Sequence, residues 1–253
     1  MTFIGEDLRG KCVVVTGATG GIGSAVARGF AEIGAHVLAV DLRDDLLTEL
    51  IKDLPGSGHE PFALNLSQLD EHENLFKHAQ EMGGFQALVH CAAVLRRRTT
   101  VDEVTEEDWD FQLDLNLKAT FFLNRTARDV MKANATKGAI VNFSSQGWWT
   151  GGFGGSVVYA ASKGGVVSMT RGLARSFAPE GIRINAIAPG GVDTNMLTEG
   201  QSPEAMKAFL DLIPMGRLAQ PQEIAQAALF LASSASSYIT GALINISGGQ
   251  LMY

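Results

Sequence analysis

Short runs of β-branched and other apolar residues alternate with longer segments of helical spacing. Seven such runs predict strands, at residues 12–16, 36–41, 62–66, 87–91, 139–144, 182–188 and 242–247. Between most of them apolar residues recur every three or four positions, as in Ile22, Val26 and Phe30, which predicts helices. Because the strands are apolar on both faces, each needs cover above and below. The pattern predicts a doubly wound α/β fold with a seven-stranded, mostly parallel sheet and helices on both faces.

The chain of 253 residues contains no linker, repeat or low-complexity tract, and a domain of this size can bury a substantial core. We therefore expect a single domain over residues 1–253. Only residues 189–215 lack an obvious element, and long loops of this kind often form lids or binding loops. Ligands of open parallel sheets bind beyond the carboxyl ends of the strands, so the candidate chemistry is expected there.

Charge and composition exclude several partners. Twenty Lys+Arg against 27 Asp+Glu give a net charge of −7, so no chain-wide cationic field attracts nucleic acid or anionic lipid. Cys12 and Cys91 lie in apolar runs and are too few for a disulfide-stabilised secreted scaffold. No signal-peptide pattern opens the chain, and Ser and Gly interrupt the uncharged stretch from Ile224 to Tyr253. We expect a cytoplasmic protein with no nucleic-acid or membrane partner and no metal site.

A glycine-rich segment, Gly17–Gly23, follows the first predicted strand directly and opens a helix. Without side chains the backbone can approach a pyrophosphate, and the helix N-terminus offers free N–H groups. Asp41 closes the second strand, where a carboxylate can accept both hydroxyls of an adenosine ribose and repels a 2′-phosphate. The pattern favours dinucleotide binding over an ordinary tight turn, and NAD over NADP. Arg43 could compensate for Asp41 if its side chain turned inward.

Tyr159 and Lys163 are four residues apart in a segment with helical spacing, so they share one helix face. A lysine cation about 4 Å from a phenol, at an effective dielectric of ~20, contributes about 4 kcal/mol, or roughly three pKa units of acidification. We therefore expect Lys163 to lower the pKa of Tyr159 toward neutrality. Taken alone, a surface Tyr and Lys that happen to have this spacing are the more common case.

Four motifs in this order resemble the short-chain dehydrogenase/reductase family. They are T-G-x-x-x-G-x-G from Thr16, N-F-S-S at 142–145, the Tyr159 and Lys163 pair, and P-G-x-x-x-T from Pro189. The resemblance covers essentially the whole chain and implies a single Rossmann domain with a nicotinamide cofactor. It also implies a catalytic set of Asn116, Ser145, Tyr159 and Lys163. Ser145 is preferred over Ser144 because the catalytic serine of the family is the second of the pair.

The resemblance assigns a role to each member of this set. Tyr159 is the general acid/base for the substrate hydroxyl, and Ser145 hydrogen-bonds the same oxygen. Lys163 lowers the pKa of the phenol and holds the nicotinamide ribose, whereas Asn116 anchors a water that passes the proton to solvent. The hydride chemistry belongs to the nicotinamide. The full set expected to contact the cofactor is Gly17, Thr19, Gly21, Ile22, Gly23, Asp41, Asn65, Leu66, Cys91, Ala92, Ala93, Tyr159, Lys163, Pro189, Val192 and Thr194.

The chain departs from the family pattern after the fourth strand, where His90-Cys91-Ala92-Ala93 stands in place of the usual N-N-A-G. The small residues still permit close approach of the cofactor. We expect His90 to be a buried histidine bonded to backbone rather than a catalytic group. Cys91 is most simply a small core residue.

Three segments on the expected substrate side have two interpretations each. The aromatic stretch 146–153 forms either a pocket wall or an oligomer or lid contact. Arg96–Arg98 could meet an anionic substrate, but three consecutive charges cannot all point one way, so a solvated loop is expected. Apolar residues between Met196 and Leu212 form either a mobile lid or a subunit contact.

The leading hypothesis is an NAD(H)-dependent oxidoreductase that interconverts a secondary alcohol and a ketone. One alternative is a 3-oxoacyl thioester reductase, which would favour NADPH and a basic patch for an acyl carrier. A second is a non-catalytic NAD-binding regulator, which predicts an eroded catalytic set. The family resemblance also implies a homotetramer, and the uncharged C-terminus from Ile224 is compatible with burial at an interface. The sequence leaves the substrate and the physiological direction open.

Overall fold

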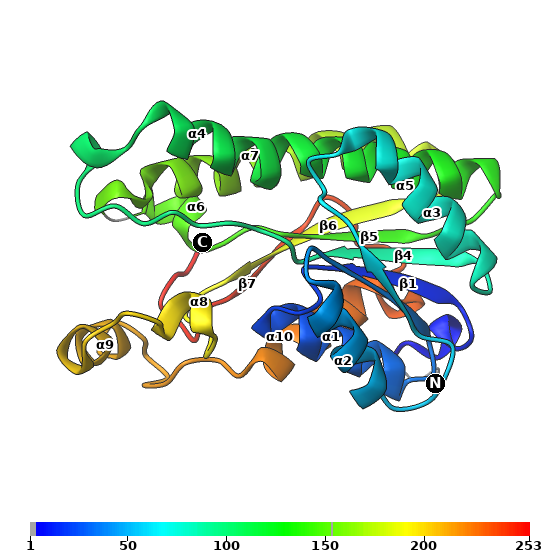
Figure 1. The fold of residues 1–253 in the computed structure, drawn as a ribbon, viewed down its shortest axis with the longest axis horizontal. Coiled ribbons are helices and arrows are strands. Elements are labelled where there is room, and N and C mark those ends of the chain that lie inside the picture. Colours follow the sequence, from blue (N-terminus) through cyan, green and yellow to red (C-terminus); the bar gives the residue numbers. More distant parts are fainter. Residues whose placement is uncertain (1–3, 153) are drawn as a thin grey trace.

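The computed structural model describes residues 4–152 and 154–253 and is built around one seven-stranded sheet (Figure 1). The strands have the order β3-β2-β1-β4-β5-β6-β7, and every adjacent pair is parallel. Their bounds are β1 Cys12–Thr16, β2 His36–Asp41, β3 Glu60–Ala63, β4 Phe85–His90, β5 Ala139–Phe143, β6 Arg183–Pro189 and β7 Leu243–Ile246. The predicted doubly wound sheet is confirmed.

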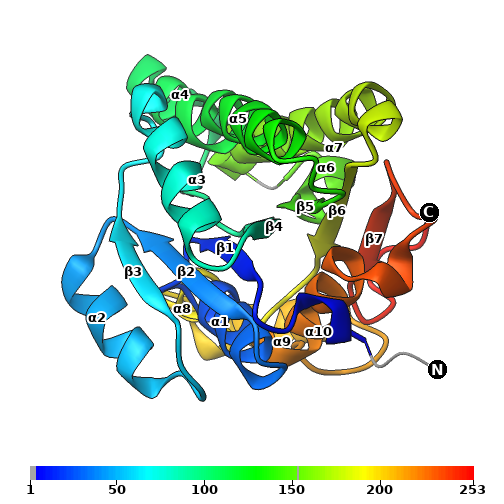
Figure 2. The same cartoon turned by 90° about the vertical axis from the view of Figure 1, so that its right-hand side faces the viewer.

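Helices cover both faces of the sheet (Figure 2). One face carries α1 Gly21–Glu32, α2 Asp44–Asp53 and α10 Pro221–Ala232, and the other carries α3 His72–Glu81, α4 Glu106–Leu113, α5 Thr120–Ala133 and α7 Val157–Phe177. The alternation within β1 explains the two layers, because Val13 and Val15 join the core beneath α1 whereas Cys12 and Val14 join the other core. Strands without a polar face therefore require both helical layers.

The third strand is the one whose predicted position differs most. It spans Glu60–Ala63 rather than residues 62–66, while the other predicted strands agree to within two residues. As an edge strand it pairs only with β2, so its own residues are mostly exposed. Leu64 and Leu66 are buried although they lie beyond the strand. At a sheet edge, an apolar run in the sequence thus includes residues that are buried in the loop after the strand as well as residues of the strand itself.

The segment 189–215 also differs from the prediction, because it contains two helices, α8 Asn195–Thr198 and α9 Pro203–Leu210. A helix start is legible in the sequence: Ser202 accepts a hydrogen bond from the Ala205 N–H at 3.2 Å, and Pro203 occupies the first turn. The stretch is therefore a helical arm that follows β6.

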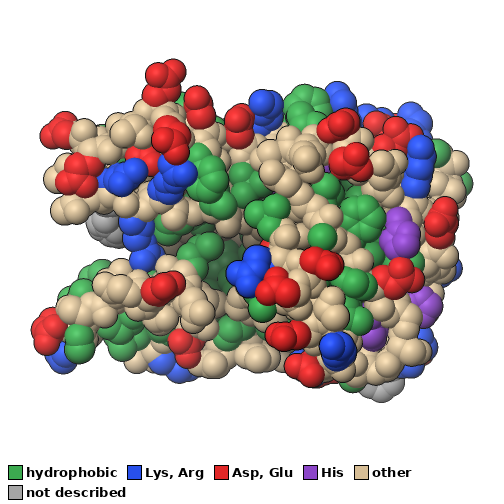
Figure 3. Space-filling view, in the orientation of Figure 1, with side chains coloured by type: hydrophobic (Ala, Val, Ile, Leu, Met, Phe, Trp, Pro, Cys, Tyr) green, Lys and Arg blue, Asp and Glu red, His purple; other side chains and the backbone are tan. Residues whose placement is uncertain are grey.

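The loops that follow β1, β4, β5 and β6 all leave the sheet at its carboxyl edge, on the left of Figure 1, where α6 Gly147–Thr150 and α8 lie. The space-filling view shows a cleft at this edge, with basic side chains at its mouth (Figure 3). Within the described part of the chain, no helix combines the length and apolar character needed to cross a membrane.

Candidate active site

The glycine-rich segment forms a surface that side chains would block. Gly17 has a φ of +65°, and a Cβ there would lie 2.7 Å from the Ala92 N. A Cβ at Gly21 would lie 2.6 Å from Cγ2 of Thr194. These distances place the loops after β1, β4 and β6 against one another, with α1 beginning at Gly21. Such a cradle beside a helix N-terminus fits a dinucleotide pyrophosphate.

Asp41 is held over this loop by three donors. The Thr19 N–H and hydroxyl donate to its Oδ2 at 3.1 and 2.7 Å, and the Leu42 N–H donates to its Oδ1 at 2.7 Å. Arg43 does not turn inward, because its guanidinium forms two hydrogen bonds with Asp45, at 3.0 and 2.8 Å. The carboxylate is therefore oriented at the end of β2, and the hydrogen bonds of Arg43 go to Asp45 rather than to Asp41.

The other expected cofactor residues are placed unequally. Cys91, Ala92 and Ala93 follow β4 beside Gly17, and Ile22 lies in the first turn of α1. Thr194 lies against Gly21, and Val192 forms a bridge with Ala219. Pro189 ends β6, Gly23 packs against the Gly17 backbone, and Leu66 is buried. Asn65 is exposed, and its side chain accepts a hydrogen bond from the Ser67 N–H at 3.0 Å.

Three of the four expected catalytic residues meet at the carboxyl edge. Ser145 follows β5, and its side chain hydrogen-bonds that of Tyr159 on α7. Lys163 lies one turn further along α7, with Nζ 5.6 Å from the centroid of the Tyr159 ring. Its ammonium donates to the Phe143 carbonyl at 2.8 Å. The choice of serine also has a structural reason, since the Ser144 hydroxyl donates to the Lys163 carbonyl at 2.9 Å and anchors α7.

The expectation that Lys163 acidifies Tyr159 is wrong for this structure. Burial raises the pKa of Tyr159 to about 12, and the Ser145 hydrogen bond and the charge of Arg97 offset this only in part. Burial also lowers the pKa of Lys163 to about 8. The simple argument from spacing assumed a full cation beside a solvated phenol. Here desolvation acts on both groups, and the ammonium is turned to a backbone carbonyl.

Asn116 lies in a π-helical segment, Asp114–Ala119, between α4 and α5. Its side chain is fully engaged: Oδ1 accepts from the Val94 N–H at 2.9 Å, and Nδ2 donates to the Val94 carbonyl at 2.9 Å and to Ser162 Oγ at 3.2 Å. It does not contact Tyr159 directly in these bonds. Single π-helical turns often occur at functional sites. The amide of Asn116 therefore positions the loop after β4 against α7.

His90 is buried as expected, but its partners are hydroxyls and not backbone. Nδ1 lies 2.7 Å from Thr16 Oγ1, and Nε2 lies 2.8 Å from Thr120 Oγ1. The Thr120 hydroxyl donates to the Asn116 carbonyl at 2.8 Å, so its oxygen is free to accept from Nε2–H. Burial lowers the pKa of His90 to about 3, which keeps the ring neutral. His90, which stands where the family pattern N-N-A-G begins, thus links β1, β4 and the turn that contains Asn116.

The aromatic stretch after Ser145 packs against the C-terminal residue. The rings of Trp148 and Trp149 lie 5.2 and 5.7 Å from that of Tyr253, and Trp148 Nε1 donates to the Tyr253 hydroxyl at 3.4 Å. Trp149 is 58% exposed. Phe153, the last aromatic of the stretch, lies outside the described residues. Sequence reasoning had no signal for the contact with Tyr253, because it joins segments about a hundred residues apart.

Comparison with known proteins places this geometry in a family. Residues 17–250 match a family model described as enoyl-(acyl carrier protein) reductase. The chain is 41% identical to a 3-oxoacyl-(acyl-carrier-protein) reductase of Thermotoga maritima, over 97% of this chain and 99% of the relative. It is 34% identical to a (3R)-3-hydroxyacyl-CoA dehydrogenase of Canis lupus familiaris, over 97% and 98%. It is 36% identical to a 2-dehydro-3-deoxy-D-gluconate 5-dehydrogenase of Escherichia coli, over 97% of each.

These matches extend over almost the whole chain and include the glycine loop, the serine after β5 and the Tyr159 helix. The chain belongs to the short-chain dehydrogenase/reductase family and is an NAD(P)-dependent oxidoreductase that acts on CH–OH groups.

Proposed function

We propose that the protein interconverts a secondary alcohol and a ketone, with NAD(H) as the hydride carrier. The observation that supports this most directly is the hydrogen bond between Ser145 and Tyr159, which places two hydroxyls where one substrate oxygen can meet both. The glycine cradle and Asp41 lie at the same edge of the sheet. The nicotinamide, when bound, supplies or accepts the hydride.

The protein residues handle the proton. With its pKa raised to about 12, Tyr159 is a neutral phenol at pH 7 and is ready to donate its proton to a carbonyl oxygen. Ser145 donates a hydrogen bond to the same oxygen as negative charge develops on it. Oxidation of an alcohol needs the deprotonated phenol, so it is favoured at higher pH. Lys163, with a pKa of about 8, exchanges its proton near neutrality and can support that step once its ammonium leaves the Phe143 carbonyl.

The choice of NAD is supported by the surroundings of Asp41. The guanidinium of Arg43 is hydrogen-bonded to a second carboxylate, Asp45, so a 2′-phosphate would have to compete with this pair. The segment Gly17–Gly23 contains no Lys or Arg. A 2′-phosphate would therefore meet the oriented carboxylate of Asp41, and charge repulsion would weaken NADP binding.

A second candidate is a 3-oxoacyl thioester reductase that uses NADPH. The names of the Thermotoga and Canis relatives favour a thioester substrate over a general alcohol. The same Tyr159 and Ser145 geometry would serve it, because the reacting group is again a ketone. The two candidates differ in the cofactor and in the group attached beside the carbonyl.

The experiment that separates them measures turnover of acetoacetyl-CoA with NADH and with NADPH, beside NAD reduction with polyols, hydroxy acids and sugar acids. The first proposal expects NAD(H) to be preferred by about tenfold or more. A preference for NADPH with acetoacetyl-CoA would overturn it in favour of the second candidate. In either case Tyr159→Phe should lose about 10²–10⁴-fold in kcat while binding the cofactor as before.

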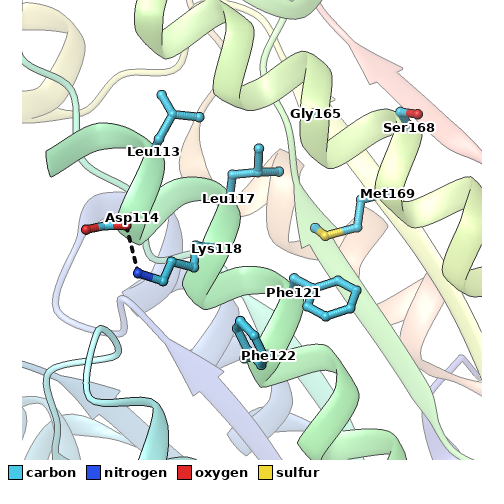
Figure 4. A pocket seen from close by; sticks show the side chains of 9 residues that line it. All are labelled: Leu113, Asp114, Leu117, Lys118, Phe121, Phe122, Gly165, Ser168 and Met169. Atoms are coloured by element: carbon cyan, nitrogen blue, oxygen red, sulfur yellow. Dashed lines mark hydrogen bonds and ion pairs between the residues drawn. The ribbon is translucent and has the colours of Figure 1, made fainter. Parts of the chain in front are cut away.

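We also propose a homotetramer in which α4, α5 and α7 pack against a second copy. A groove of about 590 Å³ lies between these helices, lined by Leu113, Leu117, Phe121 and Met169 among others (Figure 4). Phe121 is 37% exposed. On α7 the groove is bordered by Gly165 and Ser168, whose small size leaves room for a side chain of a second copy. Light scattering should give a tetramer for the wild type, and Ser168→Arg should shift it to smaller species. A monomeric wild type would overturn this.

A further inference from the structure

The three arginines after β4 have unlike surroundings. Arg96 pairs through Nη1 with Glu107 at 2.9 Å and with Asp108 at 3.2 Å. Arg98 forms two bonds with Asp108, through Nε and Nη2, each of 2.8 Å. Asp108 is 1% exposed, and these bonds hold its pKa well below the usual range. Two of the three charges are thus paired with carboxylates of α4. The segment is the exposed loop that the sequence predicts, but two of its three arginines are held by ion pairs.

The backbone of the same loop is fixed at alternate residues. The Val94 N–H and carbonyl pair with the Asn116 amide, and the Arg96 N–H donates to Gln112 Oε1 at 3.1 Å. Successive side chains of an extended segment point to opposite sides. Residues 94, 96 and 98 are anchored to α4 and to the π-helical turn that follows it. The side chain of residue 97 therefore points to the opposite side of the segment.

Arg97 crosses toward the opposite wall of the cleft. Its Nη2 donates to the Met196 carbonyl of α8 at 2.9 Å. Within residues 4–152 and 154–253 it forms no ion pair, unlike its two neighbours. A guanidinium carries five donors, so a single neutral carbonyl leaves most of its capacity unused. The charge lies exposed between the arm after β6 and the loop after β4.

The arginine loop lies next to the segment that leads into the Tyr159 helix. The Arg98 carbonyl accepts a hydrogen bond from the Gly155 N–H at 3.1 Å, which places the arginine loop beside the segment that leads into α7. The positive charge of Arg97 also lowers the pKa of Tyr159. The Gly155 contact places the arginine loop beside the start of α7, and the electrostatic effect on Tyr159 agrees with this placement.

We propose that Arg97 binds the carboxylate of the substrate, so that the enzyme acts on a hydroxy acid and its oxo acid. The proposal rests on the alcohol and ketone chemistry proposed above and names its substrate class. A planar guanidinium fork matches a carboxylate with two parallel charge-assisted hydrogen bonds. A thioester carbonyl is neutral and would gain less from it. Arg97 therefore selects the free acid over its thioester or amide.

Calorimetry on the NADH-loaded protein tests this without turnover, because NADH and an alcohol are both reduced and cannot react. The probes are 3-hydroxybutyrate and gluconate, with 3-hydroxybutyramide as the neutral counterpart. We expect the wild type to bind at least one acid more tightly than the amide. Arg97→Ala should weaken acid binding by about 10-fold or more and Arg97→Lys by less, with NADH affinity unchanged.

Arg175→Ala is the matched control, since it removes the same charge from the last turn of α7, about 24 Å along the helix from Tyr159. It should bind the acids as the wild type does. Failure of the wild type to bind either acid, equal binding by acid and amide, or equal binding by wild type and Arg97→Ala would each overturn the proposal. Thermal melting confirms that the variants fold. If Tyr159→Phe kept the turnover of the wild type, the proposed function would be overturned instead. Failure of the carboxylate proposal and failure of the proposed function therefore give different results.

Discussion

In the loop between β1 and α1 the binding surface is made of backbone, whereas around the ends of β4 and β5 and along α7 the site depends on buried polar side chains. Gly17 and Gly21 have neighbours that leave no room for a Cβ. Lys163 and His90, by contrast, are 2% and 3% exposed and have pKa values moved toward the neutral form by burial. The cofactor side depends on close approach, and the catalytic side on desolvated groups.

This difference has a consequence for stability. A close-packed glycine loop contributes to folding and binding together, because the same geometry serves both. A buried ammonium or imidazole opposes folding whenever its unfolded form would be charged. Filling the glycine loop should therefore destabilise the protein, removing the buried ammonium should stabilise it, and removing the buried imidazole should change how stability depends on pH. Three variants test this.

The largest loss is expected for Gly17→Ala. A φ of +65° is unfavourable for alanine, and the new methyl would meet the Ala92 backbone at 2.7 Å. We expect a loss of about 3 kcal/mol in the free energy of unfolding, together with weaker NAD binding. Urea unfolding and calorimetry measure the two effects.

Gly10→Ala separates the two causes, because Gly10 has a φ of +68° and open space around a Cβ. It should lose only the conformational part, about 1 kcal/mol. If both variants lose the same amount, the close contact with Ala92 contributes nothing and the comparison fails on the cofactor side.

The two sides also differ in how far the sequence reveals them. Gly17–Gly23 and Asp41 could be predicted because the requirement is for residue types, small or acidic, at fixed places after strands. Tyr159 and Lys163 could be paired by spacing, but the direction of the pKa shift could not, since it depends on burial from several elements. The role of Arg97 could not be predicted, because Arg97 stands out only when Asp108 pairs with both neighbouring arginines. No local sequence pattern connects Asp108 with the arginine loop.

Lys163→Met should gain stability while it loses activity. Burial lowers the pKa of Lys163 from 10.5 to about 8, so keeping it charged near pH 7 costs up to about 3 kcal/mol. Methionine removes that cost but also the bond to the Phe143 carbonyl, and we expect a net gain of about 1–2 kcal/mol. Turnover should fall by at least about 100-fold. Thermal melting and kinetics measure both.

Lys77→Met is the surface counterpart, since Lys77 is exposed and forms an ion pair with Glu73 one turn away on α3. Its effect on stability should stay within about 0.5 kcal/mol. A Lys163→Met variant less stable than wild type would show that the Phe143 bond outweighs desolvation, and the proposed contrast between the two sides would not hold.

The effect that depends most on pH is expected for His90→Asn. The pKa of His90 is lowered from 6.5 in the unfolded chain to about 3, so between these values the unfolded state binds one proton more than the folded state. Stability from this group is therefore fully present above about pH 6.5 and is lost progressively as pH falls toward 3.

At pH 7 the variant should be less stable by about 1–2 kcal/mol, because asparagine cannot span the distance between Thr16 and Thr120 that the imidazole bridges. Near pH 4.5 the free energy of unfolding of the wild type has fallen by about 2–3 kcal/mol because of His90 alone, whereas that of the variant has no such loss. The difference in melting temperature should therefore shrink or reverse on acidification.

His78→Asn, on the surface beside Glu60, controls for loss of an imidazole. A difference between wild type and His90→Asn that stays constant from pH 7 to 4.5 would mean that the ring is not held neutral, and that the catalytic side is less desolvated than its packing implies.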